Sequence, residues 1–440
     1  MRDAARPGGL RSPNRRRVGP ALLALALGAG LVACGGAEGG TPTLTWYTNP
    51  DNGGQRELAA KCTERAEGRY RIEVSELPAD ADSQREQLVR RLAANDSSID
   101  LMSLDVVFVP EFAEAGFLRP FTEGEARPLT EDVLDGPLAT TEWEGEVVAA
   151  PFWANTQLLW YRRSVAEAAG IDPAAEDVTW DDVIDAAVAT GTTVEVTGAR
   201  YEGYMVWINT LVASAGGEIV EDPDAGRDAR PALDSPAGRR AAEVIRRLAH
   251  EAANPSLSTA IEENARAGFQ SDNGGFMVNW PYVYQAAQSA VEEGSLDPEV
   301  FDDIAWARVP RVDPDRESAP PLGGIDLGIG AFTDHPDLAV EAVTCITELE
   351  SQIEYMLAEG NSGARAAVYD DPEVRDAFPM ADLIRESIDS AAPRPRSSYY
   401  PDISAATVRE FHPPRSVDPE TTPADADRLI VDVLQDRELL

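Results

Sequence analysis

Residues 97–118 read SSIDLMSLDVVFVPEFAEAGFL, and this stretch decides the fold. Residues 99–104 (IDLMSL) predict a buried strand that ends at Asp105, and 107–115 predicts a helix that stops at Gly116. The chain before it repeats the same order, with expected strands at 44–48 (LTWYT) and 71–77 (RIEVSEL) and expected helices at 58–66 and 84–94. Strands that alternate with helices predict an α/β fold, in which a mostly parallel sheet is flanked by helices.

Polar residues follow two of these strands. The turn-rich segment 49–54 (NPDNGG) comes directly after the first strand, and Asp105 closes the third. Ligands of such sheets sit beyond the carboxyl ends of the strands. We therefore expect both positions to contribute to a binding site.

The length of the chain, 440 residues, favours two lobes over one small core. Residues 146–162 (EVVAAPFWANTQLLWYR) hold two apolar runs joined by PFWANT, which is typical of a strand that leaves one lobe and enters another. Residues 275–280 (GFMVNW) predict a strand that ends in polar and aromatic side chains. Residues 323–330 (GGIDLGIG) predict a strand whose glycines permit close backbone approach.

The start of the chain predicts export. Residues 1–33 hold six Arg and one Asp, and the apolar run 18–33 is shorter than the roughly 20 residues of a spanning helix, so we expect a signal peptide over 1–33. Cys34 follows Leu-Val-Ala and precedes two glycines, which resembles a bacterial lipobox, whose Cys carries a diacylglycerol. The expectation is an extracytoplasmic protein anchored by lipid on Cys34 through a Gly-rich tether at 34–43. The alternative is an ordinary secretion signal with an incidental Cys.

Two further cysteines, Cys62 and Cys345, complete the set of three. In an oxidising compartment exactly two remaining thiols favour one disulfide, and the alternative is two buried free cysteines.

The charge of the chain excludes several classes of function. The formal net charge is −39, and phosphate binding needs basic patches, so we expect no nucleic-acid partner. Lys61 is the only lysine, which leaves no phosphate-binding P-loop. His250, His335 and His412 are scattered without metal-ligand spacing, so we expect neither a metal nor a cofactor.

Several stretches resemble the solute-binding proteins of carbohydrate ABC importers, in the maltose/trehalose branch, and most of all its actinobacterial trehalose-binding lipoproteins. The stretches are LTWYT, residues 97–118, APFWANTQLLWYR (150–162), GGFMVNWPYVY (274–284) and GGIDLGI with the helix after it (323–349). The resemblance implies a type II periplasmic-binding-protein fold of two α/β lobes joined by a hinge. Lobe 1 would be 44–150 plus 323–362, and lobe 2 would be 151–322 plus 363–440.

The resemblance also implies a function. The chain would be a monomeric, non-enzymatic subunit that holds trehalose or a related disaccharide in the cleft and presents it to the membrane permease subunits. Asp105 would accept hydrogen bonds from sugar hydroxyls, Asn155 would supply an amide, and Trp280 would stack on a ring. Gly323 and Gly324 would bring backbone close to the sugar, and Arg394 would donate hydrogen bonds.

Two positions depart from the family pattern. The spacing around Glu262 and Glu263 differs by one residue, so either carboxylate fits the expected role. The loop that contains Asn52 is richer in Asn, which bears on disaccharide preference.

The residue types suit a sugar. Carboxylates accept and guanidinium groups donate hydrogen bonds to hydroxyls, and aromatic faces pack on the apolar faces of pyranose rings. Each residue has a structural alternative: a helix cap for Asp105, core packing for Trp280, a surface charge for Arg394, a turn for Asn155, and relief of crowding for the glycines. Tyr282 and Tyr284 fit either the cleft or the core.

Competing functions remain open at this point. Maltose or another α-glucoside is an alternative ligand. A surface-anchored glycoside hydrolase is an alternative of another class, and it needs two carboxylates roughly 5–10 Å apart, for which Asp105 with Glu262 or Glu263 are candidates.

Overall fold

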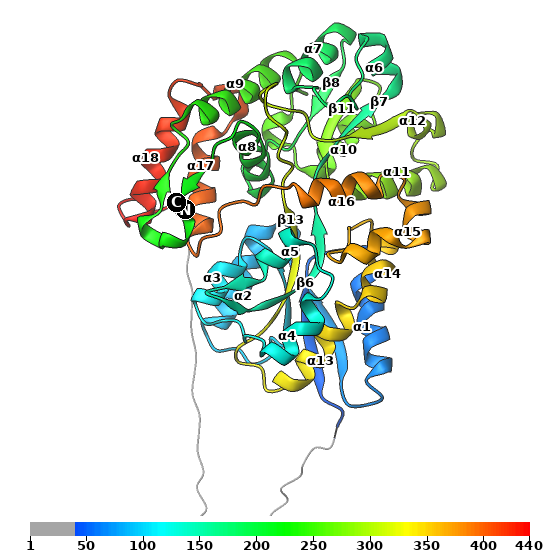
Figure 1. The fold of residues 1–440 in the computed structure, drawn as a ribbon, viewed down its shortest axis with the longest axis vertical. Helices are drawn as coiled ribbons and strands as arrows, with labels where there is room; N and C mark the ends of the chain where they lie inside the picture. Colours follow the sequence, from blue (N-terminus) through cyan, green and yellow to red (C-terminus); the bar gives the residue numbers. More distant parts are fainter. Residues whose placement is uncertain (1–39) are drawn as a thin grey trace, which may run out of the picture. The chain divides into compact units, whose positions relative to one another are not determined.

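The computed structural model describes residues 40–440, of which 41–440 form one compact unit (Figure 1). The predicted signal peptide, the lipidation of Cys34 and most of the 34–43 tether lie outside the described residues. In the described part of the chain no helix is both long enough and apolar enough to cross a membrane.

The first sheet has five strands in the order β2-β1-β3-β13-β6. Their bounds are β1 (Thr43–Thr48), β2 (Arg71–Glu76), β3 (Leu101–Asp105), β6 (Ala149–Asn155) and β13 (Gly323–Ile329). Strand β1 runs parallel to β2 and β3, whereas β13 runs antiparallel to β3 and β6. The expected order of strand, helix, strand, helix, strand over the first hundred residues is confirmed by β1, α1 (Gly54–Arg65), β2, α2 (Ala81–Leu92) and β3.

The second sheet has four strands in the order β12-β7-β11-β8. Their bounds are β7 (Leu158–Arg162), β8 (Thr193–Glu195), β11 (Gly274–Asn279) and β12 (Ile304–Ala307). Strand β7 is antiparallel to both neighbours, and β11 is parallel to β8. The predicted α/β class with mostly parallel strands is confirmed. Each sheet is nevertheless mixed, because one strand runs against the others, β13 in the first sheet and β7 in the second.

The mixed directions follow from the crossings between the sheets. Strand β6 ends at Asn155 and continues into β7 of the second sheet. Strand β13 comes from the second sheet, so it begins where β6 and β3 end, with Gly323 opposite Asn155 and Ile325 opposite Asp105. A strand that enters a sheet at the edge where its neighbours leave must run antiparallel to them.

Helices flank both sheets (Figure 1). The remaining ones are α3 (Val109–Glu114), α4 (Glu123–Thr130), α5 (Asp135–Thr140), α6 (Arg163–Ala169), α7 (Trp180–Thr190), α8 (Glu202–Ser214), α9 (Pro236–Glu251), α10 (Glu262–Phe269), α11 (Tyr282–Glu292), α12 (Pro298–Asp302), α13 (Pro336–Ile346), α14 (Leu349–Glu359), α15 (Pro372–Ala377), α16 (Ala381–Asp389), α17 (Tyr400–Phe411) and α18 (Thr422–Leu434). Two short hairpins, β4 (Glu142–Trp143) with β5 (Glu146–Val147) and β9 (Val220–Glu221) with β10 (Arg230–Pro231), complete the fold.

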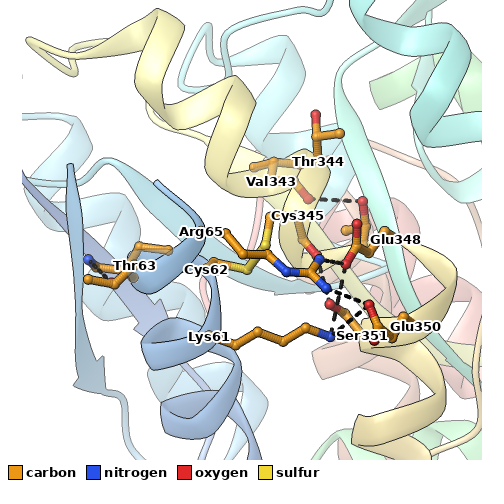
Figure 2. The surroundings of a disulfide bond; sticks show 12 residues. Lys61, Cys62, Thr63, Arg65, Val343, Thr344, Cys345, Glu348, Glu350 and Ser351 are labelled. Carbon is orange, nitrogen blue, oxygen red and sulfur yellow. Dashed lines mark hydrogen bonds and ion pairs between the residues drawn. A yellow bond between two sulfur atoms is a disulfide. The ribbon is translucent and has the colours of Figure 1, made fainter. Parts of the chain in front are cut away.

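The predicted disulfide is present. Cys62 on α1 is bonded to Cys345 on α13, with a Cα–Cα distance of 5.9 Å. Around it, Lys61 and Arg65 of α1 form ion pairs with Glu348 and Glu350 at the start of α14 (Figure 2). The covalent bond therefore joins helices that come from opposite ends of the first sheet's sequence, and exposed ion pairs add only a little to it.

Removing this cross-link should lower stability. The bond joins positions 283 residues apart, so it restricts the unfolded chain strongly. For Cys62→Ala/Cys345→Ala we expect the free energy of unfolding in urea to fall by about 2–4 kcal/mol. Lys61→Met is the control, because it removes neighbouring ion pairs and leaves the disulfide, and it should cost under about 1 kcal/mol. An unchanged urea midpoint in the double variant would contradict the expectation.

Candidate functional site

A cavity of about 560 Å³ lies where strand ends of both sheets converge. Its wall includes the turn after β1, the ends of β3 and β6, the residue after β11 and the start of β13. All the residues predicted as ligand contacts line it: Asn52, Asp105, Asn155, Glu262, Glu263, Trp280, Gly323, Gly324 and Arg394. The structure thus gathers them in one place, and their contact with a ligand stays a prediction.

The sequence analysis missed other residues of the wall, among them Trp153, Tyr201, Glu202, Glu359 and Asn361. Trp153 had a usable signal, because it lies two residues before Asn155 on the same strand and therefore on the same face. Glu202 had none, since an acidic residue in the first turn of a helix is common for reasons of helix electrostatics.

Arg394 is the charged centre of the cavity. It is 3% exposed, so it is not a surface charge. Its Nη1 lies 2.6 Å from Glu202 Oε1, and its Nη2 lies 3.0 Å from Asp105 Oδ1. Burial by itself lowers the pKa of Arg394, but the two carboxylates raise it overall.

Asp105 has two roles at once. Its Oδ1 accepts a hydrogen bond from the backbone N–H of Val107 at 3.2 Å, which stabilises the turn after β3. The helix cap considered as its structural alternative is not formed, because Phe108 precedes α3. The same oxygen accepts from Arg394, and the side chain is 21% exposed, so Asp105 remains available at the wall.

Glu202 is fully enclosed. Tyr400 donates a hydrogen bond to its Oε1, and Ser404 Oγ donates to its Oε2 at 2.7 Å. Burial raises the pKa of Glu202 to about 7, because it outweighs the opposing effect of Arg394 and because Asp105 adds repulsion. The single positive charge of Arg394 is thus shared between two carboxylates, those of Asp105 and Glu202.

The two neighbouring glutamates differ. The Tyr201 hydroxyl donates a hydrogen bond to Glu262, and desolvation raises the pKa of that carboxyl. Glu263 instead pairs with Arg266 at 2.7 Å, and its side chain is 55% exposed. Glu262 is therefore the better placed of the two for a ligand.

Trp280 lies against the start of β13. A Cβ at Gly323 would sit 2.9 Å from the indole ring of Trp280, so only glycine lets the ring lie on this strand. Gly324 has a φ of +135°, and a Cβ there would lie 2.4 Å from the carbonyl oxygen of Trp153. Relief of crowding, the structural alternative, accounts for both glycines.

The two asparagines are partly occupied by internal contacts. Glu359 Oε2 accepts from the backbone N–H of Asn52 at 2.9 Å and from its Nδ2 at 3.1 Å. Asn155 Oδ1 accepts from the backbone N–H of Thr156 at 3.0 Å, which supports its structural role in the turn. Tyr284, by contrast with Tyr282, packs on Phe301 and Trp306 and does not line the cavity.

Four buried polar atoms of the wall have no hydrogen-bond partner within residues 40–440. They are Asn49 Oδ1, Trp153 Nε1, Tyr282 Oη and Arg394 Nε. Buried polar atoms are nearly always paired in folded proteins. All four belong to residues that line the cavity. In the same described range no cluster of His, Cys, Asp and Glu has the arrangement of a metal site.

Comparison with known proteins identifies the family. The model of the bacterial extracellular solute-binding protein family matches residues 56–353, more than half of the chain, and the chain belongs to this family. It is therefore an extracytoplasmic solute-binding protein and not an enzyme, which removes the glycoside hydrolase alternative.

Individual relatives agree with this assignment. A probable ABC transporter-binding protein of Deinococcus radiodurans is 24% identical over 348 residues, which cover 76% of this chain and 79% of the relative. The maltose-bound structure of T. maritima MalE3 superposes with a TM-score of 0.76 at 27% identity, covering 90% of this chain and 99% of that one. The GacH receptor of Streptomyces glaucescens reaches a TM-score of 0.75 at 20% identity, with coverage of 90% and 100%, and shows the shared fold.

The raised pKa of Glu202 predicts a pH dependence of stability. Between the ordinary value of 4.5 and about 7, the folded protein holds a proton on Glu202 that the unfolded chain has released. This contribution is fully present below about pH 4.5 and is lost as the pH rises through about 7, by at most about 3 kcal/mol. Urea unfolding at pH 5 and pH 8 should therefore show a smaller loss in Glu202→Gln than in the wild type. Equal losses in both proteins would show that Glu202 does not titrate in this range.

Proposed function

We propose that this chain is the substrate-binding subunit of an ABC sugar importer and that it captures trehalose in the cavity around Arg394. The observation that carries the proposal is that hydrogen-bonding side chains of both kinds, donors and acceptors, line one cavity together with aromatic side chains. Arg394 has N–H groups to donate, and Asp105 and Glu262 have oxygens that accept. A sugar hydroxyl can donate one hydrogen bond and accept others, so it matches both kinds of group.

The shape and chemistry of the cavity support a disaccharide. About 560 Å³ falls within the range of roughly 300–1,000 Å³ for small-molecule sites. Asp105 and Glu262 add ionisable acceptors, and the rings of Trp153 and Trp280 offer faces for pyranose rings. The T. maritima neighbour was solved with maltose bound, which makes maltose the second candidate.

The proposed mechanism is closure of two lobes on the sugar. Lobe 1 comprises 44–150 plus 323–362 and contains most of the first sheet. Lobe 2 comprises 151–322 plus 363–440 and contains the second sheet, and the boundary at 150 falls within β6. A sugar that contacts walls from both lobes favours the closed arrangement by its extra contacts there. The permease subunits then recognise the closed protein.

The proposed location is the outer face of the membrane. A diacylglycerol on Cys34 anchors the monomer, and the tether 34–43 joins the lipid to the lobes. This part rests on the sequence at 18–36 alone.

Calorimetric titration of residues 36–440 with trehalose, maltose and glucose tests the function. We expect saturable one-site binding of trehalose, lost in Asp105→Ala and Trp280→Ala. If the protein binds maltose and not trehalose, the proposed sugar is wrong and the proposed role in an ABC importer stands. No heat with any of the three would show that the proposal of a sugar is wrong.

Tyr282→Phe separates binding from stability. The variant removes an unpaired buried hydroxyl, so the free energy of unfolding should stay equal or rise slightly, because no internal hydrogen bond is lost. Trehalose affinity should fall about two- to tenfold, since a hydrogen bond contributes about 0.5–1.5 kcal/mol.

Tyr284→Phe is the matched control, because Tyr284 packs on Phe301 and Trp306 outside the cavity wall. Its affinity should equal that of the wild type. Equal affinities of Tyr282→Phe and the wild type would place the sugar away from Tyr282.

A further inference from the structure

Glu202 has an unusual position for a carboxylate. It is the first residue of α8, a helix that is buried over most of its length, and the residue itself is 5% exposed. Both of its oxygens are engaged by protein groups: Oε1 by Arg394 and Tyr400, and Oε2 by Ser404. A carboxylate whose oxygens already accept these bonds has little capacity left for a ligand.

Arg394 depends on α8 for its placement. It lies between Pro393 and Pro395, whose rings restrict the backbone but leave the long side chain free. Asn209 of α8 donates from Nδ2 to the carbonyl oxygen of Pro393 at 3.3 Å, which fixes the backbone on one side. Glu202 is the first residue of the same helix, and its Oε1 lies 2.6 Å from Nη1 of Arg394.

These contacts form a continuous chain across the molecule. It runs from α17 (Tyr400 and Ser404) through Glu202 on α8 to Arg394, and from there to Asp105 at the end of β3. Arg394 lines the cavity while its Nη1 and Nη2 are held by Glu202 and Asp105. Glu202 therefore determines where the guanidinium of Arg394 lies at the cavity.

We propose that Glu202 is a positioning residue for sugar binding, which acts through Arg394 without touching the sugar. This inference rests on the proposed function. The groups that face Glu202 are Arg394, Asp105, Tyr400 and Ser404, so the carboxylate has one cationic neighbour. A hydrogen bond to a charged group is stronger and more directional than a neutral one, which suits this role.

A double-mutant cycle in the full chain, purified in detergent, tests the proposal by trehalose affinity. Glu202→Gln should bind trehalose about tenfold more weakly than the wild type, and Arg394→Gln more weakly still. The double variant should match Arg394→Gln alone, because Glu202 has nothing left to position. A merely structural effect of Glu202 would instead add to the effect of Arg394→Gln.

Two further variants control for folding. Glu195→Gln changes a carboxylate that is 4% exposed and lies outside the cavity wall, so it should leave affinity unchanged. Tyr400→Phe removes one donor to Glu202 and should weaken binding in the same direction as Glu202→Gln, which keeps the test valid if Glu202→Gln does not fold.

The outcomes distinguish the two proposals. Suppose that the wild type binds trehalose. If the effects of Glu202→Gln and Arg394→Gln then add, or if Glu202→Gln and Tyr400→Phe both bind like the wild type, Glu202 is not a positioning residue. The proposed function stands in either case. If the wild type binds neither trehalose nor maltose, both proposals fail together.

Discussion

The crossings of the chain between the two sheets constrain the rest of the structure. The chain passes from β6 to β7 after Asn155 and returns to β13 at Gly323, and the register pairs these two residues. The ends of β3, β6 and β11 and the start of β13 consequently meet at one cavity. Antiparallel neighbours in both sheets are a consequence of this arrangement, since the chain leaves and enters each sheet at the same edge. A site at this junction receives side chains from segments as distant in sequence as Asn52 and Arg394.

The two most buried arginines of the described chain, Arg365 and Arg394, have different kinds of partner. Arg365 donates only to backbone carbonyls, those of Thr347, Glu131 and Pro128, and so ties together the ends of helices. Arg394 pairs with two carboxylates and keeps its Nε without a partner. Each of the three guanidinium nitrogens of Arg365 therefore donates a hydrogen bond that stabilises the fold. Arg394 is held by two carboxylates and lines the cavity.

The sequence predicted more of the site than of the sheet directions. Asp105 and the loop with Asn52 could be placed because polar residues at strand ends converge in α/β sheets, and every predicted contact lines the cavity. The reversed directions of β13 and β7 were not predicted, because local apolar runs carry no information on which edge a strand enters. Glu202 was invisible for a different reason: its significance depends on Tyr400, Ser404 and Arg394, about 200 residues further along the chain. The choice between Glu262 and Glu263 likewise needed the partner Arg266.

The unpaired atoms at the cavity connect stability with binding. A buried polar group without a partner costs roughly 1–3 kcal/mol, so the four at the wall represent a considerable free energy that the fold tolerates at one place. A ligand that supplies the missing partners lowers the free energy of the folded protein and leaves the unfolded chain unaffected. Stability and binding would then be linked at this one cavity, because the ligand would act on the folded state alone.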